Sequence, residues 1–201
     1  MTTVATDYAT LAELKLSLQI DPGDLTRDTL LAMALSAAAR GIDSACGRRF
    51  WLDPAPTART YNPGGRTLST DGGERLVVDD IGDPAGLLVE TGTAGAWTAV
   101  AGYETGPDNA LARGRPVTAL VIPAGTWGYG TSRVRVTARW GWPAVPDDIV
   151  QATLIQAARL YRRKDSPEGV TGSAEWGVVR LSRRDPDVWA LIEHFIVPGF
   201  G

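Results

Sequence analysis

The chain has 201 residues, of which 44% are hydrophobic and 21% are charged, so it can build a packed core and wholesale disorder is excluded. The net charge of −3 argues against a chain that coats nucleic acid. We expect no secretory signal and no membrane contact, because the N-terminus lacks basic and apolar signal regions and every apolar run is short. The single cysteine, Cys46, excludes an internal disulfide and suits a reducing cytoplasm.

The first 50 residues predict two helices. Thr10 and Glu13 have the spacing of a capping box, so the first helix begins at Thr10 and ends near Leu18. The second begins near Asp24 or Thr26 and continues to about Cys46. Its apolar arc is wider than one packed face requires, and comprises Leu30, Leu31, Met33, Ala34, Leu35, Ala37, Ala38, Ile42 and Ala45. Such a helix is either the centre of its own bundle or partly buried by a neighbouring subunit.

Residues 52–140 predict β-strands separated by turns rich in glycine, proline and asparagine. The clearest strand is 132–140, where Val134, Val136 and Ala138 alternate with polar residues. The other expected strands are 57–61, 74–79, 86–91, 96–100 and 117–122. The stretch Gly125–Gly130 is expected to be a turn between strands. Short strands at this spacing indicate a small antiparallel sandwich or barrel-like lobe.

The chain then returns to helix. Asp147 and Asp148 open a third helix at the end where acidic side chains stabilise the helix dipole, and its core stripe is Val150, Leu154, Ala157 and Tyr161. A long loop, 165–184, precedes a fourth helix that Asp185 caps and whose apolar face is Val188, Leu191, Ile192, Phe195 and Ile196. The prediction is an α+β fold: a discontinuous four-helix base, 1–51 and 141–201, with an antiparallel β lobe, 52–140, inserted between helices two and three.

The sequence offers little catalytic chemistry. No Walker loop, G-x-S-x-G elbow or H-E-x-x-H helix is present, and one histidine and one cysteine do not suit a zinc site. His194 is expected to be a surface residue. We therefore predict a protein that is not an enzyme and that uses no cofactor or metal. The seven tryptophans favour core packing, with glycan binding through Trp97 and Trp127 as the alternative from another functional class.

The basic stretch from Trp176 to Arg184 lies inside the long loop. It reads equally well as a loop or short edge strand of the same subunit and as an arm that pairs with another chain by strand addition.

The order of these elements resembles a known family. The similarity rests on the Ala-rich second helix that ends in Ala45-Cys46-Gly47-Arg48-Arg49-Phe50, on Val134–Gly141, on Val145-Pro146-Asp147-Asp148-Ile149, on Tyr161-Arg162-Arg163, and on Asp185-Pro186-Asp187-Val188. In this order the chain resembles the head-to-tail connector (adaptor) proteins of tailed bacteriophages, the gp6-like group. The large β insertion departs from the shortest members of that family.

The resemblance implies a homo-oligomeric ring, commonly twelvefold, that binds the portal protein in the virion neck at the capsid vertex. Such a ring assembles in the host cytoplasm, extends the channel through which genomic DNA passes without specific binding, and joins the next neck or tail protein. Lateral ring contacts are expected at Leu30, Met33, Ala37 and Arg40. Portal or neighbour contacts are expected at Val178, Val179, Arg180, Leu181, Arg183, Arg184, Phe195, Pro198 and Phe200. A stopper or tail-completion protein, one layer further along the neck, is the related alternative.

Overall fold

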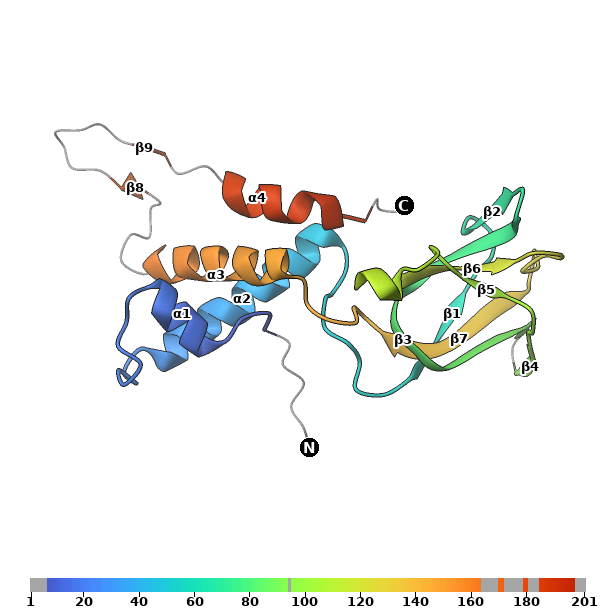
Figure 1. Ribbon diagram of the computed structural model, residues 1–201, viewed down its shortest axis with the longest axis horizontal. Helices are drawn as coiled ribbons and strands as arrows, with labels where there is room; N and C mark the ends of the chain where they lie inside the picture. The colour runs from blue at the N-terminus through green and yellow to red at the C-terminus, as the bar shows by residue number, and fades with distance from the viewer. Residues whose placement is uncertain (1–6, 94, 164–169, 172–178, 181–184, 198–201) are drawn as a thin grey trace. The chain divides into compact units, whose positions relative to one another are not determined.

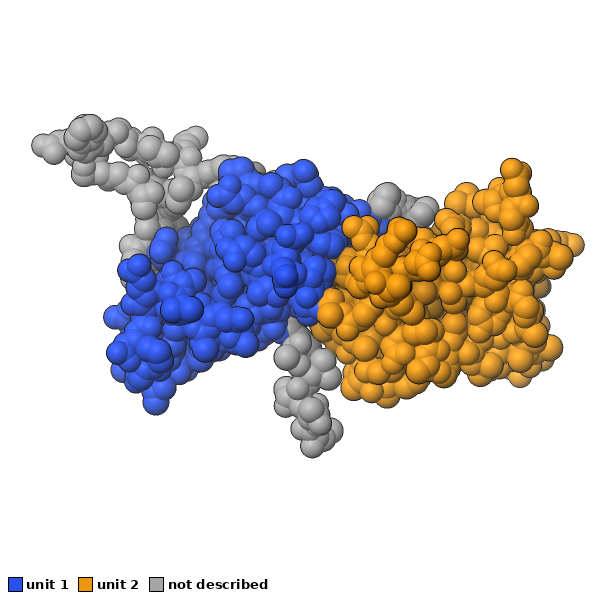
Figure 2. Space-filling model, in the orientation of Figure 1, with its two compact units in different colours: residues 1, 3–49, 145–201 blue, residues 2, 50–144 orange. Residues whose placement is uncertain are grey.

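The computed structural model describes residues 7–93, 95–163, 170–171, 179–180 and 185–197 (Figure 1). These residues form two compact units, a helical unit from both parts of the chain and a β unit over residues 50–144 (Figure 2). The α+β prediction is confirmed, because helices α1 and α2 precede an antiparallel seven-stranded sheet and helices α3 and α4 follow it.

The helical unit begins with α1, Leu11–Ser17, and α2, Asp28–Cys46. The predicted capping box is present: the Thr10 hydroxyl accepts the Glu13 N–H, and the Glu13 carboxylate accepts the Thr10 N–H at 2.7 Å. α2 begins later than predicted, because the Asp24 carboxylate accepts the Thr26 N–H at 3.0 Å and holds that segment in a turn. α2 ends where Gly47 adopts a left-handed conformation.

The second half of the helical unit consists of α3, Asp147–Arg162, and α4, Pro186–Ile192, which continues as the 3-10 turn η3, Glu193–Phe195. α1 and α4 lie on opposite sides of the α2–α3 pair (Figure 1). The α1–α2–α3 core contains Leu14, Leu31, Ala34, Leu35, Ala38 and Ala157. Of the predicted α3 stripe, Ala157 is buried, and Val150, Leu154 and Tyr161 pack against this core as partly buried residues.

Asp185 caps α4 as predicted, with Pro186 at the first helical position. Val188, Ile192 and Phe195 are the buried members of the predicted apolar face. In the segment between α3 and α4 the structure describes a short antiparallel pair, β8, Val170–Thr171, and β9, Val179–Arg180. At these positions the chain pairs with itself, as the edge-strand interpretation expects.

The β unit is a sheet in the order β1-β7-β3-β6-β5, with β2 and β4 also paired to β3. Its strands are β1 Thr57–Tyr61, β2 Thr67–Thr70, β3 Gly73–Thr93, β4 Ala96–Ala99, β5 Glu104–Gly106, β6 Val117–Ile122 and β7 Arg133–Trp140. The 3-10 turn η1, Leu111–Arg113, lies between β5 and β6.

The predictions for β1 and β6 are confirmed residue by residue, whereas β2 and β5 were not predicted. The two strands predicted at 74–79 and 86–91 are one 21-residue strand, β3. Its early residues pair with β6 and its later residues with β7, and the pairing register shifts between Val77 and Leu88. These irregularities absorb Gly82, Pro84 and Gly86, which in isolation are turn residues.

Tryptophans anchor the core of the β unit. Trp127 and Trp140 are fully buried, and their indole N–H groups donate to the carbonyls of Glu74 and Thr57 at 2.9 and 2.8 Å. The predicted turn at Gly125–Gly130 lies between β6 and β7 and carries Trp127 inward. Among the described helices, none has the length and hydropathy required to cross a bilayer.

Candidate functional site

One side of α2 is apolar and open to solvent. Leu30 is 49% exposed and Met33 is 64% exposed, and Ala37 and Gly41 continue the same side at intervals of three and four residues. We call Leu30, Met33, Ala37 and Gly41 the α2 stripe. The core-facing side of the helix holds Leu31, Ala34, Leu35, Ala38, Ala39, Ile42 and Cys46. The wide apolar arc seen in the sequence is therefore divided between the core and solvent.

Arg40 borders the α2 stripe and is held by contacts of its own. Its Nε lies 2.9 Å from the Asp43 carboxylate, and its guanidinium stands 5.9 Å from the centre of the Tyr8 ring. The Tyr8 hydroxyl donates to the same carboxylate. Arg40 is exposed, so this network places a fixed positive charge beside the apolar stripe.

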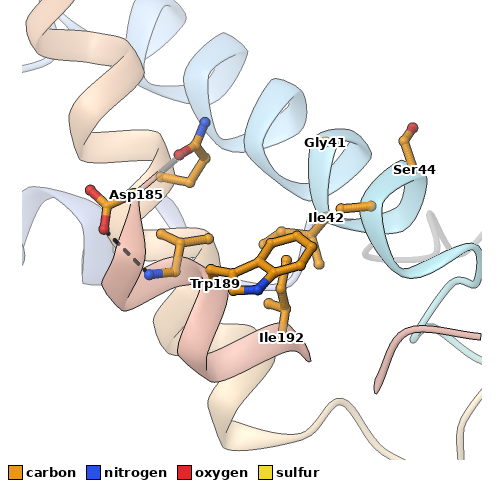
Figure 3. Close-up of a pocket in the computed structure, with 9 residues that line it drawn as sticks. Gly41, Ile42, Ser44, Asp185, Trp189 and Ile192 are labelled. Carbon is orange, nitrogen blue, oxygen red and sulfur yellow. Dashed lines mark hydrogen bonds between the residues drawn. The ribbon is translucent and has the colours of Figure 1, made fainter. Parts of the chain in front are cut away.

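A groove opens where the α2 stripe reaches the last turns of α2. It has a volume of about 380 Å³ and is lined by Gly41, Ile42, Ser44, Ala45, Gln156, Asp185, Val188, Trp189 and Ile192. We call it the α2–α4 groove. Trp189 points from α4 toward α2 (Figure 3). Asp185 lies at the far end, where it caps α4 and stands 3.4 Å from Arg159.

α1 and the turn that follows it carry two further exposed leucines. Leu16 in α1 is 80% exposed, and Leu25 in the turn before α2 is 71% exposed. The buried Lys15 fixes this turn: its ammonium donates to the carbonyls of Pro22 and Asp24 at 3.3 and 3.0 Å and lies 2.5 Å from the Asp28 carboxylate. The exposed leucines are therefore presented by an ordered segment. This arrangement could not be predicted from sequence, because it depends on how the turn folds back over Lys15.

The expected lateral residues Leu30, Met33, Ala37 and Arg40 all lie on solvent-exposed positions of one helix, and their contacts remain a prediction. Among the expected portal contacts, Val179 and Arg180 form β9. Phe195 is 7% exposed in the isolated chain, and its portal contact remains a prediction. The others lie outside the described residues: Val178, Leu181, Arg183, Arg184, Pro198 and Phe200.

The alternative function, glycan binding through Trp97 and Trp127, requires both rings to be accessible. Trp127 is fully buried, as core packing of the tryptophans predicts, so its ring is not placed to stack on a glycan as the alternative requires. Trp97 is partly exposed, but the Arg135 guanidinium lies 4.4 Å from its ring centre. That arginine is held in turn by a two-pronged hydrogen bond to Glu90, at 2.7 and 2.8 Å.

The single histidine, the single cysteine and the adjacent pair Asp79 and Asp80 each have structural partners or surroundings. His194 is a surface residue as predicted, with Nε2 3.5 Å from Asp148. Burial raises the pKa of the Cys46 thiol to about 11. Asp79 pairs with Arg59 at 2.6 Å whereas Asp80 accepts the Trp142 indole N–H at 3.1 Å, so the adjacent carboxylates have separate partners. Within the described ranges no three His, Cys, Asp or Glu side chains are grouped to hold a metal.

Comparison with known proteins identifies relatives by fold. No protein-family model and no curated protein matches the chain. A chain from the neck of an empty gene transfer agent (GTA) particle, computed with C6 symmetry, is 22% identical, with a TM-score of 0.56, and the match covers 100% of this chain and 96% of that one. A chain from the virion of a native GTA particle is 20% identical, with a TM-score of 0.53 and the same coverage. This chain therefore shares, over its whole length, the fold of chains found in those particles.

Proposed function

We propose that this chain is a structural head-to-tail connector (adaptor) subunit of a tailed phage or phage-like particle. The observation that carries the proposal is the likeness of fold to a particle-neck chain, which extends over the whole of this chain. The helix–β–helix order on which the sequence resemblance rested is also the order of elements in the structure. The protein would act in the virion neck at the capsid vertex, after assembly in the host cytoplasm, and would act by binding and not by catalysis.

The α2 stripe supports a ring of identical subunits. A ring forms when each subunit offers two different surfaces, each of which binds the other on a neighbour. The helical unit exposes Leu30 and Met33 on α2, and it also exposes Leu16 on α1 and Leu25 in the turn before α2. Covering Leu30 and Met33 would contribute about 1–2 kcal/mol each, since roughly half or more of each side chain is still exposed. Their contribution is repeated at every interface of a closed ring.

Twelve subunits is the number that the family resemblance implies. The sixfold symmetry stated for the GTA neck is one that a twelvefold ring also possesses. A ring of this kind would extend the channel under the portal. The net charge of −3 suits a channel wall along which DNA slides, because a strongly basic wall would retain the phosphate backbone.

The remaining partners are the portal protein and the next neck or tail protein. The segments proposed for portal contact are the basic stretch around β9 and the apolar residues that follow Val197. A stopper or tail-completion protein would use the same neck environment but would contact tail proteins only. Co-purification separates the two, because an adaptor binds the isolated portal and a stopper does not.

Substitution in the α2 stripe tests the ring. Leu30→Glu/Met33→Glu places two carboxylates where an apolar contact is proposed, and we expect rings to be lost from purified necks by electron microscopy while the helical circular dichroism is kept. Leu68→Glu is the matched control, because Leu68 is 58% exposed but lies in the β unit. Normal rings from the double variant, or equal loss from the control, would contradict the lateral role of the stripe.

A further inference from the structure

The β6–β7 loop, residues 123–132, presents an aromatic ring that the core of the β unit does not use. Tyr129 is 83% exposed, more than any other exposed large hydrophobic side chain in the described part of the chain. Within the loop only Trp127 is buried. A single exposed apolar side chain is ordinary on a protein surface, so what distinguishes Tyr129 is the way in which its backbone is held.

The loop is anchored to the sheet on both sides of Tyr129. Two residues before it, Trp127 is fully buried in the core of the β unit. The Trp127 backbone N–H donates to the Glu74 carboxylate at 2.5 Å, and its indole N–H donates to the Glu74 carbonyl at 2.9 Å. Three residues after Tyr129, the Ser132 N–H donates to the Tyr129 carbonyl at 3.3 Å. These contacts fix the backbone that carries the exposed ring.

A glycine on each side of Tyr129 turns the chain so that the ring projects. Gly128 and Gly130 have φ values of +91° and +67°, in the left-handed region that other residues disfavour. Neither glycine brings a side chain that could cover a face of the ring. Because the backbone is fixed and a tyrosine has only two side-chain torsions, binding through this ring costs little conformational entropy.

The composition of the loop favours a protein as its partner. Residues 123–132 read PAGTWGYGTS and include no charged side chain. Binding to nucleic acid depends on cations that neutralise phosphates, and the loop has none. The centre of a protein–protein interface, in contrast, is depleted in charged residues and enriched in tyrosine. The loop therefore suits an uncharged protein surface.

A second exposed apolar side chain lies at the same end of the sheet. Glu74, which holds the loop, pairs with Ile122 at the end of β6, where the loop begins, and with Ser69 of β2 on its other side. Leu68 is the neighbour of Ser69 in β2 and is 58% exposed. This end of the β unit therefore offers two exposed apolar side chains, of which Tyr129 projects further into solvent.

We propose that the β6–β7 loop docks on the next neck or tail protein, with the Tyr129 ring inserted into an apolar pocket of that partner. The inference rests on the proposed function, in which the helical unit carries the surfaces for neighbouring subunits and for the portal. The next neck or tail protein is the one partner without an assigned surface. Its pocket is uncharged, to match the loop, and offers a hydrogen-bond acceptor to the Tyr129 hydroxyl.

Joining of purified heads to purified tails tests this surface. Heads that carry the chain or a variant of it are mixed with free tails, and joined particles are counted by electron microscopy. Tyr129→Ala should reduce joining by about tenfold or more. Tyr129→Phe should reduce it less, because it keeps the ring and loses only the hydroxyl. Leu88→Ala is the matched control and should leave joining unchanged, because Leu88 is 45% exposed but lies in β3, outside the loop.

The amount of the chain on the heads, measured by mass spectrometry, separates this inference from the proposed function. We expect Tyr129→Ala to be present on heads in the same amount as the unaltered chain. Heads that carry this variant and still join tails normally, or an equal loss with Leu88→Ala, would overturn the docking role of Tyr129 alone. Loss of the variant from heads would assign Tyr129 to the portal or to a second copy and would also overturn it. Absence of the unaltered chain from heads would overturn the proposed function together with this inference.

Discussion

Lys15 should contribute more to the stability of the helical unit than any exposed charge in it. The side chain is buried, donates to two backbone carbonyls of the α1–α2 turn, and lies 2.5 Å from the Asp28 carboxylate. Lys15→Met keeps the aliphatic stem and removes the ammonium. The two carbonyls then lose a charged donor, and Asp28 loses its partner.

The expected cost follows from the exposure of the two groups. Breaking a fully buried ion pair costs about 3–5 kcal/mol. The Asp28 side chain is 29% exposed, so water can hydrate part of it, and the start of α2 also favours a negative charge. We therefore expect a loss of about 2–3 kcal/mol. In urea, with an m-value of roughly 1–1.5 kcal/mol/M, the midpoint should fall by about 2 M.

Urea unfolding followed by circular dichroism at helical wavelengths measures this change, and tryptophan fluorescence follows mainly the β unit, which holds five of the seven tryptophans, including the buried Trp127 and Trp140. Only the helical transition should shift. Asp28→Asn should cost less than Lys15→Met, and the double variant should cost less than the sum of the two, because the pair interacts directly. If Lys15→Met lowers the unfolding free energy of the helical unit by less than about 0.5 kcal/mol, which is the range of ordinary surface substitutions, Lys15 does not stabilise the α1–α2 turn as argued.

Other predictions concern single groups. Burial raises the pKa of the Cys46 thiol from 9.0 to about 11. The protonated thiol therefore contributes its full stabilisation to the folded chain below pH 9, and this contribution is lost as the pH rises toward 11. At pH 8 a thiol reagent should label the folded chain about 100-fold more slowly than the urea-unfolded chain. Thr10→Ala should destabilise the helical unit by about 1 kcal/mol at pH 7. Hydrogen bonds from Thr10 lower the pKa of Glu13 below 4.5, so this difference should shrink as the pH falls to 3, and an unchanged difference would count against the capping box. Trp127→Ala should destabilise the β unit by about 3–5 kcal/mol in thermal unfolding, and Trp97→Ala much less; similar small effects would contradict a core role for Trp127.

Local sequence predicted the elements whose signals are local. The capping box at Thr10 and the cap at Asp185 depend on residues within one helical turn, and both are present in the structure. The first and last residues of β1 and β6 were also predicted correctly, because turn residues lie close to these strands in the sequence. The strand β3 could not be predicted in this way, because its continuity past Gly82 and Gly86 depends on pairing with β6 and β7, which lie far along the chain.

The candidate site was predictable in part. Helical periodicity showed that α2 has more apolar surface than one core needs, and the structure leaves Leu30 and Met33 exposed. The α2–α4 groove gave no signal, because it exists only where α4 packs beside the end of α2. The contacts of Lys15 could not be predicted for the same reason, since the backbone carbonyls of Pro22 and Asp24 supply two of its partners.

Two glycines show how structure changes the meaning of one residue type. A Cβ atom at Gly82 would lie 2.7 Å from the Gly141 carbonyl oxygen, so glycine is needed there because other backbone passes close by. At Gly41 the same construction finds open space. Within the described residues Gly41 is therefore not required by close packing, although a helix interior disfavours glycine. The α2 stripe and the α2–α4 groove meet at this residue.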